Sequence, residues 1–161
     1  MNFLIRKMTA ADVPAVAQLD RLSFSLPWPE RSFHFEVSAN PASRCYVADL
    51  DRQIVGAIVA WLLVDEVHIA TIATHPDFRR RGIAQALLAH VLEIAADEGA
   101  ISSFLEVRES NLGAQALYRK FGYEPTGRRV RYYKDNDEDA ILMTLEGLNV
   151  EKLESLKSSD L

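Results

Sequence analysis

Residues 72–84 constrain this chain more than any other segment, because they join an apolar strand to a long helix through three arginines and a glycine. Arg79–Arg81 stand in the turn, and Gly82 stands where the helical pattern begins. The N-terminus of a helix carries unpaired N–H groups and the positive end of the helix dipole, so a phosphate binds there readily. Gly82 lets the main chain approach such a ligand closely. A solvated basic turn is the alternative, but the position between strand and helix favours an anion site.

The length of the chain predicts one domain, because 161 residues are too few for two well-buried cores. The pattern is typical of a mixed α/β sheet in one layer, with helices on its faces. We expect strands over residues 3–8, 45–48, 54–64, 67–74, 102–108, 128–133 and 140–145. We expect helices over residues 10–22, 29–41, 82–98 and 111–121, and a frayed or weakly helical tail over residues 147–161.

The net charge of −5 is distributed unevenly. Residues 1–133 carry 15 basic and 15 acidic side chains, whereas residues 134–161 carry 3 basic and 8 acidic ones. A general nucleic-acid binder has an excess of Lys and Arg, so we expect no direct nucleic-acid partner. The single cysteine and the spacing of the four histidines indicate no metal site. The N-terminal segment is too short and too soon charged for a signal peptide, and the longest apolar run is too short to cross a membrane. We therefore expect a cytoplasmic protein that has no membrane partner and is a monomer or a dimer.

A carboxylate occupies the middle of the strand predicted over residues 102–108. Period-two alternation places Phe104, Glu106 and Arg108 on one face of that strand. An unpaired buried carboxylate is costly, and burial can raise its pKa so that it acts as a general base. The alternative is an ion pair between Glu106 and Arg108 or another arginine, and the pattern alone does not decide between the two.

Three further residues carry possible chemistry. Asn111 is a suitable N-cap for the helix over residues 111–121, and Tyr118 lies on the apolar face of that helix. A core aromatic is the simplest interpretation of Tyr118. His68, near the start of the strand over residues 67–74, is either a second proton acceptor or a half-exposed structural residue.

Together these segments resemble the GNAT superfamily of N-acetyltransferases. The acetyl-CoA signature of that family, [Q/R]-x-x-G-x-[G/A], matches residues 79–84, and Leu105–Arg108, Ser110–Asn111 and Ala116–Tyr118 extend the match. The resemblance covers residues 3–146 and implies one domain over residues 1–146 with an acidic C-terminal tail over residues 147–161. It implies a central mixed, mostly antiparallel, splayed sheet of about seven strands flanked by about four helices.

The resemblance also implies roles for individual residues. Acetyl-CoA is the acyl donor, and a substrate amine attacks its thioester directly. Glu106 takes the proton of the amine, and Tyr118 gives a proton to the departing thiolate. The implied cofactor-binding residues are Ile72, Ala73 and Thr74 for the pantetheine arm, Arg79, Arg80, Arg81, Gly82, Ile83, Ala84 and Gln85 for the pyrophosphate, and Asn111 for the arm.

Within the superfamily the chain is most similar to protein N-terminal acetyltransferases of the bacterial type that modifies a ribosomal-protein alanine. The likeness rests on Pro27–Trp28, Arg131–Tyr133 and Glu138–Met143. By that likeness Trp28, Tyr132 and Tyr133 flank the peptide substrate, although turn and core packing also explains them. The alternatives are an acetyltransferase for a small amine and a non-catalytic acyl-CoA-binding module. The segments Arg131–Tyr133 and Glu138–Met143 favour the first function over the second, and Glu106 and Tyr118 argue against the third.

Overall fold

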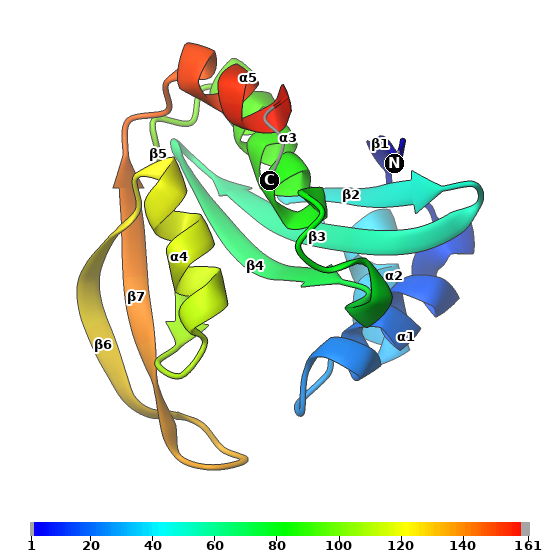
Figure 1. The fold of residues 1–161 in the computed structure, drawn as a ribbon, viewed down its shortest axis with the longest axis horizontal. Helices are drawn as coiled ribbons and strands as arrows, with labels where there is room; N and C mark the ends of the chain where they lie inside the picture. The colour runs from blue at the N-terminus through cyan, green and yellow to red at the C-terminus, as the bar shows by residue number, and fades with distance from the viewer. Residues whose placement is uncertain (1, 159–161) are drawn as a thin grey trace.

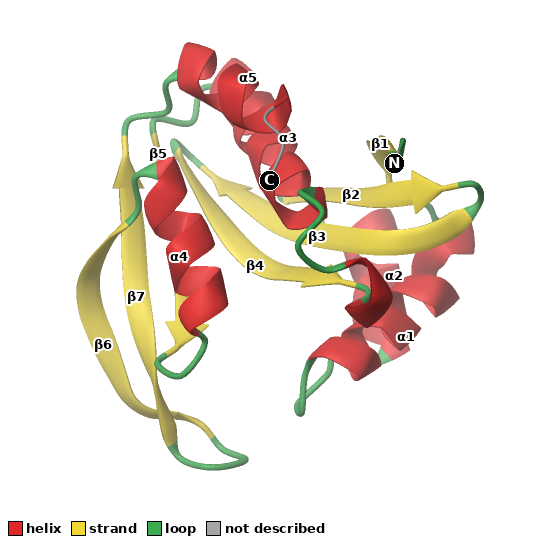
Figure 2. Cartoon of the chain, in the orientation of Figure 1, coloured by secondary structure: helices red, strands yellow, loops and turns green. Residues whose placement is uncertain are grey.

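The computed structural model describes residues 2–158, which form a mixed sheet with helices on both faces (Figures 1 and 2). The strands are β1 (Leu4–Lys7), β2 (Ser43–Leu50), β3 (Gln53–Leu63), β4 (Glu66–Thr74), β5 (Ser102–Arg108), β6 (Glu124–Tyr133) and β7 (Glu138–Glu146). The helices are α1 (Val13–Ser23), α2 (Glu30–Ser38), α3 (Ile83–Asp97), α4 (Leu112–Phe121) and α5 (Val150–Ser158), with short 3₁₀ turns at Ala10–Asp12 and Pro76–Phe78.

A single sheet of seven strands forms in the order β1-β2-β3-β4-β5-β7-β6. Every neighbouring pair is antiparallel except β4 and β5, which are parallel. The parallel pair requires a crossover, and α3 provides it between the two strands. The prediction of a mixed, mostly antiparallel sheet of about seven strands is confirmed.

Each face of the sheet has its own hydrophobic core. The larger core joins α3, α4 and α5 to one face, and its fully buried side chains include Ile58, Leu88 and Leu105. The smaller core joins α1 and α2 to the other face around Phe33 and Val59. Since alternate residues of a strand point to opposite faces, β3 contributes Ile58 to one core and Val59 to the other. Because β3 is buried on both faces, its sequence is a continuous apolar run rather than an alternating pattern.

Gly56 of β3 sets how closely α3 approaches the sheet. A Cβ atom built on Gly56 would lie 2.6 Å from Cγ2 of Ile83 and 3.0 Å from Cδ1 of Leu87. A side chain fits at that position only if Ile83 or Leu87 of α3 moves aside. The close contact fixes the first turns of α3 against β3.

The C-terminal segment differs from its prediction. Residues 150–158 form the helix α5, whose Leu153 and Leu156 are buried against the larger core. The segment is therefore a docked helix up to its last described residue, because two leucines at i and i+3 give it an apolar stripe. The remainder of the predicted tail, residues 159–161, lies outside the described residues. With α5 included, the described part of the chain has five α-helices, rather than about four.

Candidate active site

The strands β4 and β5 pair over three residues and then separate. The pairs join Glu66–His68 to Ser102–Phe104. Beyond this point the two strands diverge, as Figure 1 shows between the labels β4 and β5. Main-chain groups at such an edge can bind an extended ligand as if it were an added strand. Ile72, Ala73 and Thr74, predicted to bind the pantetheine arm, all lie on β4 beyond the separation. The splayed sheet is confirmed.

A β-bulge accompanies this separation. Ile69 pairs with Ala60 and Thr71 pairs with Val59, so Ala70 is the extra residue in β4. A bulge bends its strand and increases the local twist. This one comes directly after the last residues of β4 that pair with β5, where the two strands begin to diverge.

The N-terminus of α3 has the features that anion binding requires. Gly82 precedes the helix with a φ of +80°, a left-handed conformation that favours glycine. No side chain caps this end and the first turn contains no acidic residue. The main-chain N–H groups of Ile83, Ala84 and Gln85 belong to that uncapped first turn, so these residues fit the pyrophosphate of acetyl-CoA. The side chain of Gln85 is buried and donates to the Leu156 carbonyl, so the residue can contribute only through its main chain.

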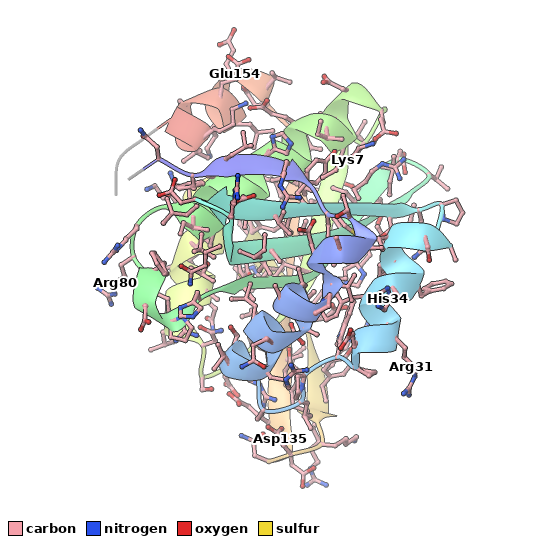
Figure 3. The ribbon with its side chains drawn as sticks, turned by 90° about the vertical axis from the view of Figure 1, so that its right-hand side faces the viewer. Lys7, Arg31, His34, Arg80, Asp135 and Glu154 are labelled. Atoms are coloured by element: carbon pink, nitrogen blue, oxygen red, sulfur yellow. The ribbon has the colours of Figure 1, made fainter. Side chains whose placement is uncertain are left out.

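The three arginines before Gly82 have different surroundings. Nε of Arg79 donates to the carbonyl oxygen of Thr74 over 3.4 Å, which ties the turn to the end of β4. The guanidinium of Arg81 lies 5.4 Å from the ring centroid of Phe78. Arg80 has a φ of +62° and projects from the surface in Figure 3. Arginine at a phosphate site adds charge-assisted hydrogen bonds, and all three are exposed beside the uncapped helix end.

Glu106 and His68 form a hydrogen-bonded pair where β4 and β5 separate. Nε2 of His68 lies 2.8 Å from Oε2 of Glu106, and both side chains are largely buried. The His68 ring stacks on Phe104 with centroids 4.5 Å apart, and its edge contacts Trp61. These contacts fix the orientation of the imidazole, so the pair is a preformed site for proton transfer.

The pKa of Glu106 is set by burial and by its partners. Burial alone would raise it, but the hydrogen bond from His68 is the largest influence and lowers the pKa below its usual value. Arg129 lies 3.9 Å from the other carboxylate oxygen and lowers it further. Of the two possibilities that the sequence leaves open, the structure favours the paired carboxylate with a lowered pKa: the main partner of Glu106 is His68, and the nearby arginine is Arg129 rather than Arg108. Glu106 is ionised at neutral pH and can accept a proton without first losing one.

Tyr118 lies on the other side of the sheet from Glu106. Its ring is buried in the larger core and its edge contacts Tyr123 at a centroid distance of 5.8 Å. Tyr123 is the more strongly anchored of the two, because its hydroxyl bonds Ser103 over 2.7 Å. Among the described residues, no hydrogen-bond partner is recorded for the Tyr118 hydroxyl. Burial raises the pKa of Tyr118 well above its ordinary value, so the hydroxyl keeps its proton at neutral pH.

Asn111 is the N-cap of α4, as predicted. Its Oδ1 accepts a hydrogen bond from the N–H of Ala114 over 3.1 Å. The cap uses only the oxygen of the side-chain amide, and within the described part of the chain Nδ2 has no recorded partner. This NH₂ group is the one that can bind a cofactor arm.

Aromatic side chains line the face that carries Glu106. Trp28 stacks on Trp61 with centroids 6.3 Å apart, and Trp61 contacts His68 at 5.3 Å. The rings thus connect the α1–α2 segment to the proton-transfer pair. Trp28 also packs on Phe33 of the smaller core, so core packing accounts for part of its environment.

The predicted substrate residues Tyr132 and Tyr133 lie at the end of β6. Tyr132 is exposed, whereas Tyr133 is half-buried beneath the guanidinium of Arg108, which lies 4.0 Å from its ring centroid. Arg108 also pairs with Asp135 over 3.0 Å, and Asp135 accepts a hydrogen bond from Ser25 of the α1–α2 segment. These contacts join the β6–β7 turn to the α1–α2 segment and close one end of the face that carries Glu106.

Three features of this site could not be read from the sequence. The partner of Glu106 lies 38 residues away, the role of Trp61 depends on its register beside His68, and the Ser25–Asp135–Arg108 contact joins three separate segments. For the first of these features the sequence offers His68 as a candidate, but the spacing of His68 along the chain does not indicate which residue is its partner. Within residues 2–158 no group of three or more His, Cys, Asp or Glu side chains is arranged to hold a metal ion, and no helix is long and apolar enough to cross a membrane.

Comparison with known sequences agrees with the splayed sheet and the glycine-capped helix. A sequence model of the acetyltransferase (GNAT) family matches residues 13–123, and the chain belongs to this family. The chain is 34% identical over 140 residues to the ribosomal protein bS18 alanine N-acetyltransferase of Salmonella typhimurium, covering 86% of this chain and 93% of that one. It is 36% identical over 139 residues to a Bacillus subtilis protein provisionally named for the same activity, covering 86% and 92%.

Solved structures show the same architecture. The alanine N-acetyltransferase of this ribosomal protein from Escherichia coli superposes with a TM-score of 0.84 at 28% identity, over 92% of this chain and 96% of that chain. Ard1 from Thermoplasma volcanium superposes with a TM-score of 0.83 at 24% identity, over 92% and 100% of the two chains, which shows a shared fold.

Proposed function

We propose that this chain transfers the acetyl group of acetyl-CoA to the N-terminal amine of a protein, with a ribosomal protein that begins with alanine as the acceptor. The observation that carries the proposal is the His68–Glu106 pair, fixed on one face of the sheet where β4 and β5 separate. Binding of acetyl-CoA alone requires no buried base at that point. The similarity to alanine N-acetyltransferases supports the choice of acceptor.

Acetyl-CoA, when bound, supplies the acetyl group as an activated thioester. Ile72–Thr74 would hold its pantetheine arm with main-chain groups, and the first turn of α3 would hold its pyrophosphate. Transfer is direct, because the single cysteine is poorly suited to carry the acyl group. Burial raises the pKa of the Cys45 thiol, which keeps it in the less reactive protonated form.

Glu106 and His68 take up the proton that the acceptor amine loses. An ammonium group cannot attack a carbonyl carbon, so the acceptor must give up a proton before or during the attack. The ionised carboxylate of Glu106 accepts that proton directly or through one water molecule. His68 holds the carboxylate in place through the bond of 2.8 Å, and its ring can share the accepted proton across that bond.

Tyr118 donates a proton to the departing thiolate. It projects from α4 into the core on the opposite face of β5, so acid and base act from opposite sides of the opening between the strands. Its raised pKa keeps the phenol protonated, which a proton donor requires.

An N-terminal amine suits this base better than a lysine side chain. The pKa of an α-amino group is ~7.7–8.0, whereas that of lysine is ~10.4. Neutralising the lysine therefore costs about 3.4 kcal/mol more near neutral pH. A carboxylate whose own pKa is lowered is a weak base, and it favours the acceptor that is easier to deprotonate.

Release of the CoA thiol in the presence of peptides tests the proposal. The panel contains Ala-, Ser- and Met-initiated peptides, a peptide with a blocked N-terminus and an internal lysine, and small polyamines. We expect the Ala-initiated peptide to give the highest kcat/KM. Faster release with polyamines would indicate a small-molecule acetyltransferase, and no release with any acceptor, despite acetyl-CoA binding, would indicate a non-catalytic binding module.

A further inference from the structure

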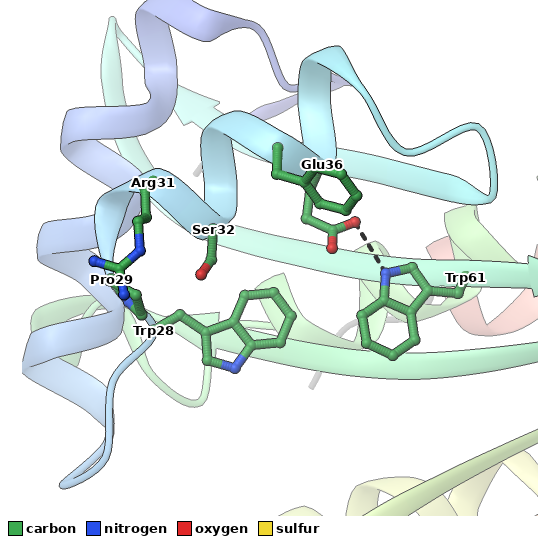
Figure 4. A pocket seen from close by; sticks show the side chains of 7 residues that line it. Trp28, Pro29, Arg31, Ser32, Glu36 and Trp61 are labelled. Atoms are coloured by element: carbon green, nitrogen blue, oxygen red, sulfur yellow. Dashed lines mark hydrogen bonds between the residues drawn. The ribbon is translucent and has the colours of Figure 1, made fainter.

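A pocket of about 450 Å³ lies between α2 and β3, next to the face that carries the proton-transfer pair. Trp28 and Trp61 form its aromatic wall, and Glu36 of α2 lies beside them (Figure 4); Phe35 of α2 also lines the pocket. The mechanism described above uses none of these four side chains for chemistry. The pocket is nevertheless contiguous with the site, because the Trp61 ring contacts His68 at a centroid distance of 5.3 Å.

The most unusual group in this pocket is the carboxylate of Glu36, a residue that is only 7% exposed. Its Oε2 accepts three hydrogen bonds from neutral donors: Nε1 of Trp61 at 2.9 Å, Oγ of Ser43 at 2.6 Å and Nδ2 of Asn40 at 3.0 Å. Figure 4 shows the second oxygen pointing away from Trp61 toward the space between the two indole rings. One oxygen is therefore fully used by the protein, and the other faces the pocket.

Among the described residues, Glu36 has no cationic partner within ion-pair distance. Arg31 lines the same pocket but lies at its opposite end, near Pro29 (Figure 4), and Figure 3 shows it projecting from the molecule. Neutral donors hold a buried carboxylate in position without cancelling its charge. A charge of this kind is stabilised most by a cation that enters the pocket.

The walls of the pocket select the same class of ligand. An indole face attracts a guanidinium or ammonium group, and two indoles stand beside the carboxylate. We infer that this pocket binds a positively charged side chain, arginine or lysine, from one of the first residues that follow the acceptor's N-terminal amine. The inference rests on the proposed function, because it assumes that the amine lies beside Glu106. In an extended peptide each residue adds ~3.3 Å, so a long side chain near the N-terminus can pass His68 and Trp61 to reach Glu36.

Peptides that differ in one charge test the inference. The series begins with alanine and carries arginine or citrulline, its neutral isostere, at position 2, 3 or 4. We expect arginine at one position to give a kcat/KM at least about tenfold higher than citrulline, a factor typical of a charge-assisted hydrogen bond. Equal rates for arginine and citrulline at every position would refute this inference and leave the proposed function intact. Absence of acetylation for the whole series would instead refute the proposed function.

Variants of α2 then show which residue distinguishes the arginine peptide from the citrulline peptide. In Glu36→Gln the ratio of kcat/KM for the arginine peptide to that for the citrulline peptide should fall to about one, while the affinity for acetyl-CoA stays unchanged. Glu30→Gln removes the same charge from an exposed position of the same helix and should keep the full ratio.

A direct binding measurement gives a readout that does not depend on turnover. The N-acetylated arginine peptide should bind the wild type more tightly than the Glu36→Gln variant in calorimetry. An equal loss of discrimination in Glu30→Gln would contradict a local site, because it would mean that the overall charge of α2 attracts the peptide.

Discussion

The part of the site that we propose binds acetyl-CoA (the donor side) and the part that we propose binds the acceptor amine (the acceptor side) are built from different features of the chain. The donor side consists of main-chain features: the unpaired edge of β4, the close contact at Gly56 and the left-handed Gly82. The acceptor side consists of side chains that meet from distant segments, such as His68 with Glu106 and Ser25 with Asp135. Main-chain geometry suits a ligand that never changes, whereas side-chain contacts can be replaced one at a time. We therefore expect changes on the donor side to alter acetyl-CoA binding, and changes on the acceptor side to alter turnover and the choice of acceptor.

The largest difference between an effect on turnover and an effect on acetyl-CoA binding is expected from Glu106→Gln. The change removes the proton acceptor, so kcat/KM should fall by about 100-fold or more. The affinity for acetyl-CoA, measured by calorimetry, should stay the same, because Glu106 is not among the residues assigned to the donor side. Glu109→Gln is the matched control, since Glu109 is exposed and follows β5 directly. Full activity of Glu106→Gln would remove Glu106 as the base.

The contrast between the two sides also explains how much the sequence could predict. Apart from Gly56, the features of the donor side named above lie within one local segment, where the strand predicted over residues 67–74, the α3 helix and its glycine agree with the structure. The acceptor side depends on which strands become neighbours. No spacing along the chain places His68 beside Glu106, so the sequence alone does not decide whether burial raises the pKa of Glu106 or a partner lowers it.

Two further features follow the same logic. The contact of Gly56 with Ile83 is visible only once α3 lies on β3. The charged residues around Leu153 and Leu156 predict only a frayed or weakly helical tail, because the apolar stripe of α5 becomes a buried surface only when it packs against α3 and the sheet.

A substitution at Gly56 should damage the donor side selectively. In Gly56→Val the new side chain overlaps Ile83, so α3 must shift and its first turn moves with it. We expect the free energy of unfolding to fall by about 1–3 kcal/mol, as measured by urea denaturation, and the Kd for acetyl-CoA to rise several-fold. Gly113→Ala provides the comparison, since no atom lies within 4 Å of the added Cβ. It should leave the Kd unchanged and raise stability by roughly 0.5–1 kcal/mol. Unaltered acetyl-CoA affinity in Gly56→Val would mean that the close contact between α3 and β3 does not determine acetyl-CoA binding.

The smallest expected effect is the contribution of Glu106 to stability as the pH changes. Its pKa is lower in the folded chain than in the unfolded one, so the stabilisation is present above the unfolded value of ~4.3 and is lost as the pH falls through the folded value. The free energy of unfolding of the wild type should exceed that of Glu106→Gln by about 1 kcal/mol near neutral pH, and this gap should narrow below about pH 4. Urea denaturation at both pH values measures this gap. A gap that widens in acid would mean that His68 does not stabilise the ionised carboxylate.

The central claim is that the site deprotonates and acetylates an α-amine, and one competition measures it directly. A single peptide with a free N-terminal alanine, an internal lysine and an arginine near the N-terminus is incubated with acetyl-CoA and the enzyme. Tandem mass spectrometry then locates the acetyl group. We expect acetylation of the alanine amine, with the lysine unmodified. Acetylation of the lysine, with the N-terminal amine left free, would contradict the claim.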